Sequence, residues 1–155
     1  MRIHAAESEA DVDAARDLFR EYQRWLDLDL GFQGFAEELA NLPGAYAPPK
    51  GRLLLASQGE DGHVLGCVAL RPWGDRDGEM KRLYVRPQAH GQGLGRRLAE
   101  AVIAEAKAIG YRRLLLDTLP SMSSAQRLYE TLGFVDIPPY RENPVPGTRF
   151  LALEL

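Results

Sequence analysis

The stretch that decides the fold runs from Glu79 to Tyr111 and reads EMKRLYVRPQAHGQGLGRRLAEAVIAEAKAIGY. It opens with a strand-like run, residues 80–85, which ends before Pro87 because proline cannot donate to a sheet ladder. A glycine-rich loop follows, and then a long helical pattern that ends at Gly110. Glycines let the backbone approach a ligand closely, and free amides at a helix start attract negative charge. The stretch therefore predicts a cradle for an anion.

Working outward, the 155 residues suffice for one domain with a sizeable core, which we expect to span residues 1–155. The net charge of −3 argues against a nucleic-acid partner. A single cysteine, Cys67, excludes an internal disulfide and fits a reducing compartment. No apolar run approaches the roughly 20 residues that a membrane span needs, and no signal peptide is visible. These features predict a cytoplasmic protein without a membrane partner.

The N-terminal part reads as a short strand followed by two helices. Residues 2–5 can form the strand, and Ser8 is a good N-cap for a helix that should end near Gly31. A second helical pattern covers residues 35–42. Residues 42–51 carry three prolines and two glycines, which predicts a connecting loop.

Strand patterns dominate the middle of the chain and return at its end. Residues 52–57, 64–70 and the run up to Val85 are strand candidates, and the turn sequences at 59–62 and 74–78 between them favour antiparallel hairpins. Beyond the cradle, residues 113–118 contain three consecutive leucines, typical of a strand buried on both faces. A helix starting at 120–124 and stopping at Gly133, then strands near Val135 and at 149–155, complete the pattern.

This order predicts an α+β fold. We expect a mixed sheet of about six to seven strands, in which an antiparallel meander precedes a β-α-β unit, flanked by about four helices.

Two common nucleotide-binding loops fit the cradle poorly. A phosphate-binding loop of the NTPase kind needs a Gly-Lys-Ser/Thr ending, which is absent here. A Rossmann fingerprint needs glycine where Arg96 stands, and a parallel series of strands where we expect antiparallel hairpins. Asp117, about twenty residues on, could serve as its ribose ligand, but the other two requirements weigh against this interpretation.

A third interpretation rests on two motifs together. Residues 85–96, VRPQAHGQGLGR, resemble the acyl-CoA-binding motif of the GNAT N-acetyltransferase superfamily, Gln/Arg-x-x-Gly-x-Gly/Ala, with its core on His90, Gly93 and Gly95. Residues 125–134, AQRLYETLGF, look like the second motif of that family. The resemblance covers roughly residues 52–136 and implies a GNAT-like fold, acetyl-CoA as co-substrate and no metal. Two departures are His90, where glutamine or arginine is usual, and Met122, where an asparagine often stands.

The resemblance also implies which residues bind the cofactor. Leu83, Tyr84 and Val85 should pair their backbone groups with the pantetheine arm like an added strand, because the neighbouring strand splays away there in the family. The loop and helix start should hold the phosphates through His90, Gly91, Gln92, Gly93, Leu94, Gly95 and Arg96. Arg82, Arg86 and Arg97 are further candidates for phosphate contacts.

Acetyl transfer to an amine needs a base for the amine proton and a donor for the departing thiolate. The resemblance places Tyr129 near the CoA sulfur as the acid and Glu79 at the acceptor as the base. Asp117 is the reserve candidate for the base. Cys67 is expected to be a buried small hydrophobe, and His4 and His63 lack partners at metal-ligand spacing.

The sequence indicates less about the acceptor substrate than about the acetyl donor. In the family its walls come from the first helices and the C-terminal loops, here from Tyr22, Trp25, Leu26, Phe32, Phe35, Tyr46 and residues 140–148. Arg71, Trp73 and Arg141 are possible anchors for a carboxylate-bearing acceptor. We expect an N-acetyltransferase acting on a primary amine of a small molecule or peptide, possible as a homodimer. The alternatives are a non-catalytic acyl-CoA-binding module, motivated by His90 and Met122, and a transferase acting on charged tRNA, which the charge of −3 disfavours.

Overall fold

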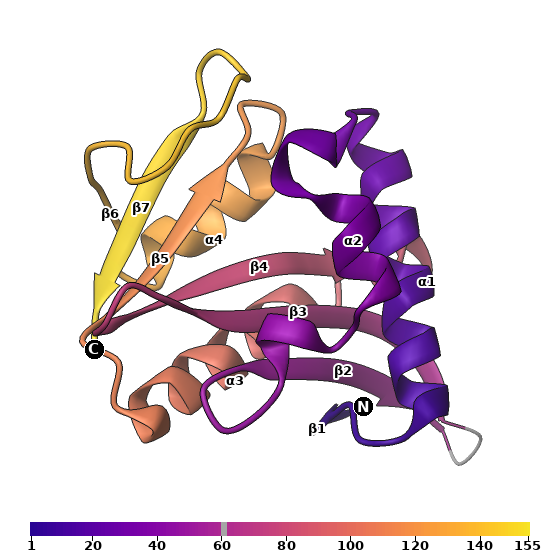
Figure 1. The fold of residues 1–155 in the computed structure, drawn as a ribbon. Coiled ribbons are helices and arrows are strands. Elements are labelled where there is room, and N and C mark those ends of the chain that lie inside the picture. The colour runs from indigo at the N-terminus through magenta and orange to yellow at the C-terminus, as the bar shows by residue number, and fades with distance from the viewer. Residues whose placement is uncertain (60–61) are drawn as a thin grey trace.

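The computed structural model describes residues 1–59 and 62–155, with the side chains of residues 32 and 33 left aside. Its strands form one open mixed sheet in the order β1-β2-β3-β4-β5-β7-β6 (Figure 1). All neighbouring strands run antiparallel except β4 and β5. The strands are β1 (Arg2–Ala5), β2 (Arg52–Gln58), β3 (His63–Trp73), β4 (Asp77–Val85), β5 (Arg113–Thr118), β6 (Val135–Asp136) and β7 (Arg149–Glu154). The α+β prediction with an antiparallel meander and a β-α-β unit is confirmed.

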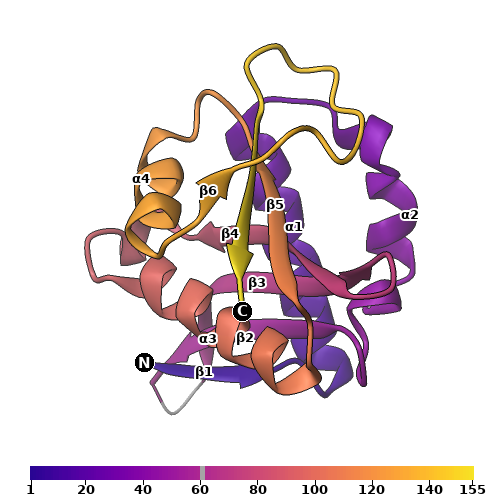
Figure 2. The ribbon, with the colours of Figure 1, turned by 90° about the vertical axis from the view of Figure 1, so that its left-hand side faces the viewer.

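Helices cover both faces of the sheet. Helices α1 and α2 lie on one face, and α3 and α4 lie on the other (Figure 2). No helix within the described ranges combines the length and the apolar character that crossing a bilayer demands. The helices are α1 (Glu9–Leu26), α2 (Phe35–Ala40), α3 (Leu94–Ile109) and α4 (Ser123–Thr131), with short 3-10 turns η1 (Leu30–Gln33), η2 (Gly44–Tyr46) and η3 (Pro87–Ala89).

The N-terminal helices begin as predicted but end earlier. Ser8 caps α1 in a complete capping box with Asp11. The helix then stops at Leu26, because Asp27 adopts a left-handed conformation with φ of 51°. The predicted end near Gly31 was therefore wrong. Helix α2 likewise stops two residues short of the predicted 35–42, and the turn η2 lies within the expected loop. Residues 60 and 61 of the predicted 59–62 turn lie outside the described residues.

Two apolar clusters fill the space between the sheet and its helices. One packs α3 and α4 against the sheet and contains Leu98, Val102 and Leu114. The other packs α1 against the opposite face around Phe19 and Leu55. The three leucines of β5 are all buried, as predicted for a strand covered on both faces.

The sheet divides between β4 and β5, and this division positions the site. The two strands pair only along Asp77, Gly78 and Glu79, so among the described residues β4 has no strand partner on that edge from Met80 onward. The predicted splay is confirmed. Within β4, Arg82 adopts a φ of 61°, opposite a register shift between Cys67 and Ala69 of β3. This is a β-bulge, which inserts one extra residue and reverses the alternation of side chains.

The bulge decides which face of the sheet each β4 side chain reaches. Strict alternation would put Met80, Arg82 and Tyr84 on one face. In the structure Met80 belongs to the cluster under α3, and Tyr84 belongs to the cluster under α1. Leu83 and Val85 consequently join Met80 on the α3 side, which is the side of the glycine loop.

Candidate active site

A groove runs along the free edge of β4 to the start of α3. It is open and largely apolar, and the loop and α4 form its opposite wall. Eight of the ten residues predicted to bind the cofactor line it. The lining consists of Trp25, Leu83, Tyr84, Val85, Ala89, His90, Gly91, Gly93, Leu94, Gly95, Met122, Ser124, Ala125 and Leu128.

The glycine loop presents backbone rather than side chains to this groove. Gly91 and Gly93 have φ values of 80° and 72°, a region that other residues rarely adopt. Gly93 is also the N-cap of α3, so no side chain caps the first amides of the helix. The ring of His90 turns back and its Nε2 donates to the carbonyl of Val85 at 2.9 Å, which closes the loop on itself. This arrangement suits a diphosphate bound by backbone amides.

The remaining predicted phosphate ligands lie elsewhere. Gln92 is exposed and Arg96 is half-exposed, and neither lines the groove. The Arg96 guanidinium contacts Glu100 at 3.0 Å on its own helix. Arg97 reaches the carbonyl of Met1, and Arg86 pairs with Glu21 of α1 at 2.7 Å.

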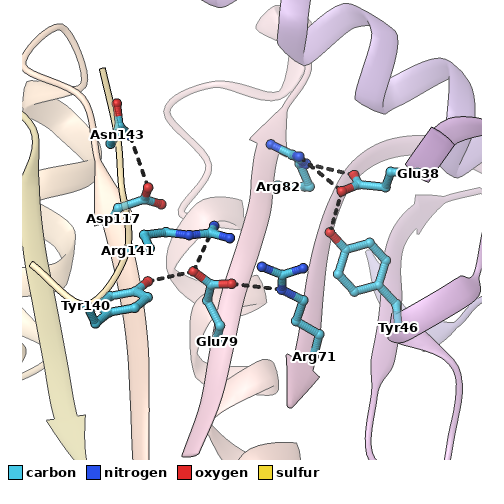
Figure 3. A network of polar contacts seen from close by, with 9 residues as sticks. All are labelled: Glu38, Tyr46, Arg71, Glu79, Arg82, Asp117, Tyr140, Arg141 and Asn143. Carbon is cyan, nitrogen blue, oxygen red and sulfur yellow. Dashed lines mark hydrogen bonds and ion pairs between the residues drawn. The ribbon is translucent and has the colours of Figure 1, made fainter. Parts of the chain in front are cut away.

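Arg82, a candidate for phosphate contacts, lies away from the glycine loop. Its guanidinium is buried and makes two bonds to Glu38 of α2, at 2.8 and 3.0 Å (Figure 3). Tyr46 donates to the same carboxylate at 3.0 Å. The bulge turns this side chain toward α2, away from the glycine loop, so it cannot meet a diphosphate there.

A second, inner pocket opens from the point where β4 leaves β5. It shares Leu83 and Met122 with the groove and reaches toward α1 and the β5 end. Unlike the groove, it has charged walls. Its lining consists of Tyr22, Leu26, Leu30, Met80, Lys81, Arg82, Leu83, Leu116, Asp117, Leu119, Met122, Tyr129 and Asn143.

Tyr129 lines the inner pocket. It lies on α4, and its ring packs against Phe134 with centroids 5.7 Å apart. Its hydroxyl finds no hydrogen-bond partner among the described residues, although the side chain is almost entirely buried. Burial raises the pKa of Tyr129, so the hydroxyl keeps its proton at any physiological pH. Tyr129 therefore both packs in the core and presents a hydrogen-bond donor to the inner pocket.

Glu79 lies beside this pocket, with its carboxylate wholly buried. One oxygen accepts from Arg71 at 2.8 Å, and the other accepts from Tyr140 at 2.6 Å and from Arg141 at 3.2 Å (Figure 3). Burial alone would raise the pKa of Glu79, but Lys81, Tyr140 and the two arginines outweigh it and lower the pKa. Both oxygens of this carboxylate are thus already engaged.

Asp117 and Lys81 both line the inner pocket. Asp117, near the end of β5, accepts from the amide of Asn143 at 3.1 Å through one oxygen. Burial lowers the pKa of Lys81 from 10.5 to about 8, opposed by Glu79 and Asp117. At neutral pH most Lys81 side chains are still protonated, so the pocket wall contains a cation and a carboxylate.

The outcomes for the other predicted residues are mixed. Cys67 is buried as expected, and burial raises the pKa of its thiol. Trp25, predicted as part of an acceptor wall, lines the groove along β4 and not the inner pocket, and the side chain of Phe32 lies outside the described residues. In the part of the chain that the structure describes, no three His, Cys, Asp or Glu side chains come together as metal ligands.

Sequence reasoning missed Glu38 and Lys81 as parts of this site, and it included Tyr140 and Asn143 only within the range 140–148, without a partner for either. Arg71, Trp73 and Arg141, the predicted anchors, do come together around Glu79. Tyr140 is 61 positions from Glu79 in the sequence. No local pattern marks such a pair, because only the antiparallel return of β7 brings the 140–148 loop over the start of β4.

Comparisons with known proteins agree with this geometry. Residues 12–134 match the family model for the acetyltransferase (GNAT) family. An uncharacterized N-acetyltransferase of Schizosaccharomyces pombe is 40% identical to this chain, and the aligned region covers 99% of this chain and 94% of that protein. A crystal structure of an acetyltransferase from Streptococcus agalactiae superposes with a TM-score of 0.81 at 24% identity, over 99% of this chain and 98% of that one. A GNAT family acetyltransferase from Elizabethkingia anophelis with acetyl-CoA bound is 28% identical, with a TM-score of 0.57 over 68% of this chain and 77% of that one.

Proposed function

This chain belongs to the GNAT acetyltransferase family and is an acetyltransferase, and we propose that it transfers the acetyl group of acetyl-CoA directly to a primary amine. The observation that carries the proposal is that the inner pocket, which Tyr129 lines, shares Leu83 and Met122 with the groove. The apolar groove suits the pantetheine arm, and the glycine loop suits the diphosphate. The inner pocket suits an amine, because its wall includes a carboxylate and a hydroxyl donor.

In the proposed reaction, the protonated amine of the acceptor gives one proton to a base, and the lone pair of the neutral nitrogen then attacks the thioester carbonyl. The tetrahedral intermediate collapses by breaking the carbon–sulfur bond, the nitrogen loses its second proton, and the departing CoA thiolate takes up a proton from solvent. The pKa of an unperturbed cysteine thiol is about 8.5 and that of an unperturbed tyrosine about 10, and burial raises the pKa of Tyr129 further, so the thiolate does not need to take the Tyr129 proton outright. Tyr129 stabilises the developing negative charge on sulfur by donating a hydrogen bond.

Two carboxylates, Glu79 and Asp117, are candidates for the base that takes the amine proton. Glu79 has the lowered pKa of a group that is ionised at neutral pH, but its two oxygens already accept three hydrogen bonds. Asp117 lines the inner pocket together with Tyr129, and only one of its oxygens has a partner among the described residues. The geometry supports Asp117 as the base and Glu79 as a residue that orients its neighbours.

Thiol release from acetyl-CoA across a panel of primary amines tests the proposal. We expect Tyr129→Phe and Asp117→Asn each to lower kcat by about 10²–10⁴-fold, the usual contribution of a positioned acid or base. Arg2→Gln is a matched control on the exposed edge strand β1, where no loss is expected. CoA binding without thiol release for any amine would favour the non-catalytic module instead. Full activity of both variants would refute the assigned roles.

A further inference from the structure

We propose that Arg71 and Arg141, held on Trp73, bind the carboxylate of the acceptor, so that the acceptor is a small amine of the amino-acid type. This inference rests on the proposed function, because it names the class of acceptor for the same site. The two arginines, called the arginine pair, both contact the Glu79 carboxylate (Figure 3), and the Trp73 ring packs against both guanidinium groups.

The first observation is charge. Two guanidinium groups share one carboxylate, Glu79, so the arginine pair keeps one positive charge in excess. Tyr140 does not compensate, because burial and the nearby Glu79 raise its pKa and keep it neutral. Lys81 adds a further cation that interacts with both Glu79 and Asp117. Half-buried positive charge of this kind favours an anionic ligand.

The second observation is the supply of free donors. A guanidinium carries five N–H groups in a planar fork that matches a carboxylate. Among the described contacts, Arg71 uses only its Nε and Arg141 only one Nη. Their side chains are 24% and 17% exposed, so a small solute can reach them. Several N–H groups on each arginine thus remain available to a second carboxylate.

The third observation is rigidity. The Arg71 and Arg141 guanidinium carbons lie 5.6 and 4.9 Å from the centroid of the Trp73 ring. Tyr140 packs edge-on against the same ring, with centroids 5.1 Å apart. Cation–π contacts and the bonds to Glu79 hold both forks in place before any ligand arrives. A preorganised site binds more tightly because less side-chain freedom is lost on binding.

The position of the arginine pair relative to the inner pocket sets the size of the acceptor. Glu79 is the last β4 residue paired with β5, and the pocket lining begins at the next residue, Met80. Arg141 also interacts electrostatically with Lys81 in the pocket wall. We therefore expect a molecule with its carboxylate on the arginine pair to direct a nearby amine toward the inner pocket, whose wall includes Asp117 and Tyr129. A compact amino acid meets this requirement, whereas a peptide N-terminus has no carboxylate so close to its amine.

Steady-state kinetics with free L-amino acids and the matching amino-acid amides test the inference. We expect the amino acids to have kcat/KM at least about tenfold higher than their amides, the ratio that one charge-assisted contact supplies. Arg141→Gln and Arg71→Gln should raise KM for amino acids by about 10–100-fold and leave kcat/KM for amides within about twofold. Arg2→Gln, which removes an exposed arginine from β1, is the control.

A binding measurement keeps the test independent of turnover and of any loss of stability in the arginine variants. The chain has two tryptophans, so Trp25→Phe leaves Trp73 as the sole tryptophan, whose emission can be excited selectively over that of the tyrosines. Titration with L-amino acids should change its emission, and titration with the amides should not. Equal responses, equal kcat/KM for acids and amides, or no response in either assay would overturn the carboxylate site. Acetyl transfer to amides but not to amino acids would refute the carboxylate site and support the proposed function. Carboxylate-dependent binding without any acetyl transfer would support the carboxylate site and refute the proposed function.

Discussion

The groove along β4 and the inner pocket differ in the kinds of residue that line them. The groove is lined by glycines, small apolar side chains and a strand edge, and its only charged or titratable lining residues are His90, which is bonded to the loop itself, and Tyr84. The inner pocket is lined by Lys81, Arg82 and Asp117, and partners from distant segments fix Arg82 and Asp117. Backbone groups can bind a constant ligand such as CoA. Side-chain charges allow the acceptor to differ from protein to protein.

The largest expected difference concerns stability. Glu79→Ala leaves two arginines without their shared counter-charge in a buried setting, so we expect a loss of about 3–5 kcal/mol in the free energy of unfolding. Urea denaturation measures it. His90→Ala removes one exposed hydrogen bond of the groove and should cost less than about 1.5 kcal/mol. Equal losses of unfolding free energy in the two variants would contradict the inference that side-chain charges matter more beside the inner pocket than in the groove.

A pH dependence follows from Lys81. Its pKa is about 8 in the folded protein and 10.5 when unperturbed. Between these values the unfolded chain binds a proton that the folded protein does not, so stability rises with pH across this window. Relative to Lys81→Met, the wild type should gain at most about 1.4 kcal/mol per pH unit from pH 8 to 10. Denaturation of both proteins at pH 7, 8, 9 and 10 measures this gain, and a difference that does not vary with pH would count against it.

The groove should respond most to backbone changes. Gly93→Val places a branched residue at a φ of 72°, which costs about 1–3 kcal/mol, and we expect CoA to bind about tenfold more weakly. Calorimetric titration with CoA measures it. Gly95→Ala is the matched comparison, because its Cβ would meet Leu128 and Val85 at an ordinary 3.9 Å. This variant should keep its stability, so any loss of CoA affinity would report how closely the ligand approaches the helix.

The smallest effect is expected for Arg96. Its side chain is half-exposed and pairs with Glu100, and exposed pairs contribute only about 0–1 kcal/mol. Arg96→Gln should therefore weaken CoA binding by less than about fivefold. A much larger loss in the same calorimetric titration would mean that Arg96 turns toward the phosphates when CoA binds. CoA binding would then depend less on the backbone groups of the groove than we infer.

Much of the groove could be predicted from the sequence because its features are local. Glycines at 91, 93 and 95 and the stop at Pro87 act within a few residues of one another. The inner pocket could not be predicted in the same way. The bulge at Arg82 depends on pairing with β3, and it sends the side chain to Glu38, 44 positions away. The end of α1 at Leu26 likewise depends on Asp27 adopting a left-handed conformation, where Gly31 offered a more obvious stop.

The sequence alone determined the order of strands and helices, the anion cradle and the likeness to an acyl-CoA-binding family. These follow from periodicity, turn residues and short motifs, whose physics is confined to neighbouring residues. Only the tertiary structure decided which charges meet. Arg71, Glu79 and Arg141 come from β3, β4 and the 140–148 loop, and burial makes their pairing strong. Electrostatic interactions in a buried site depend on distance and solvent exclusion, and neither is encoded in the spacing of residues along the chain.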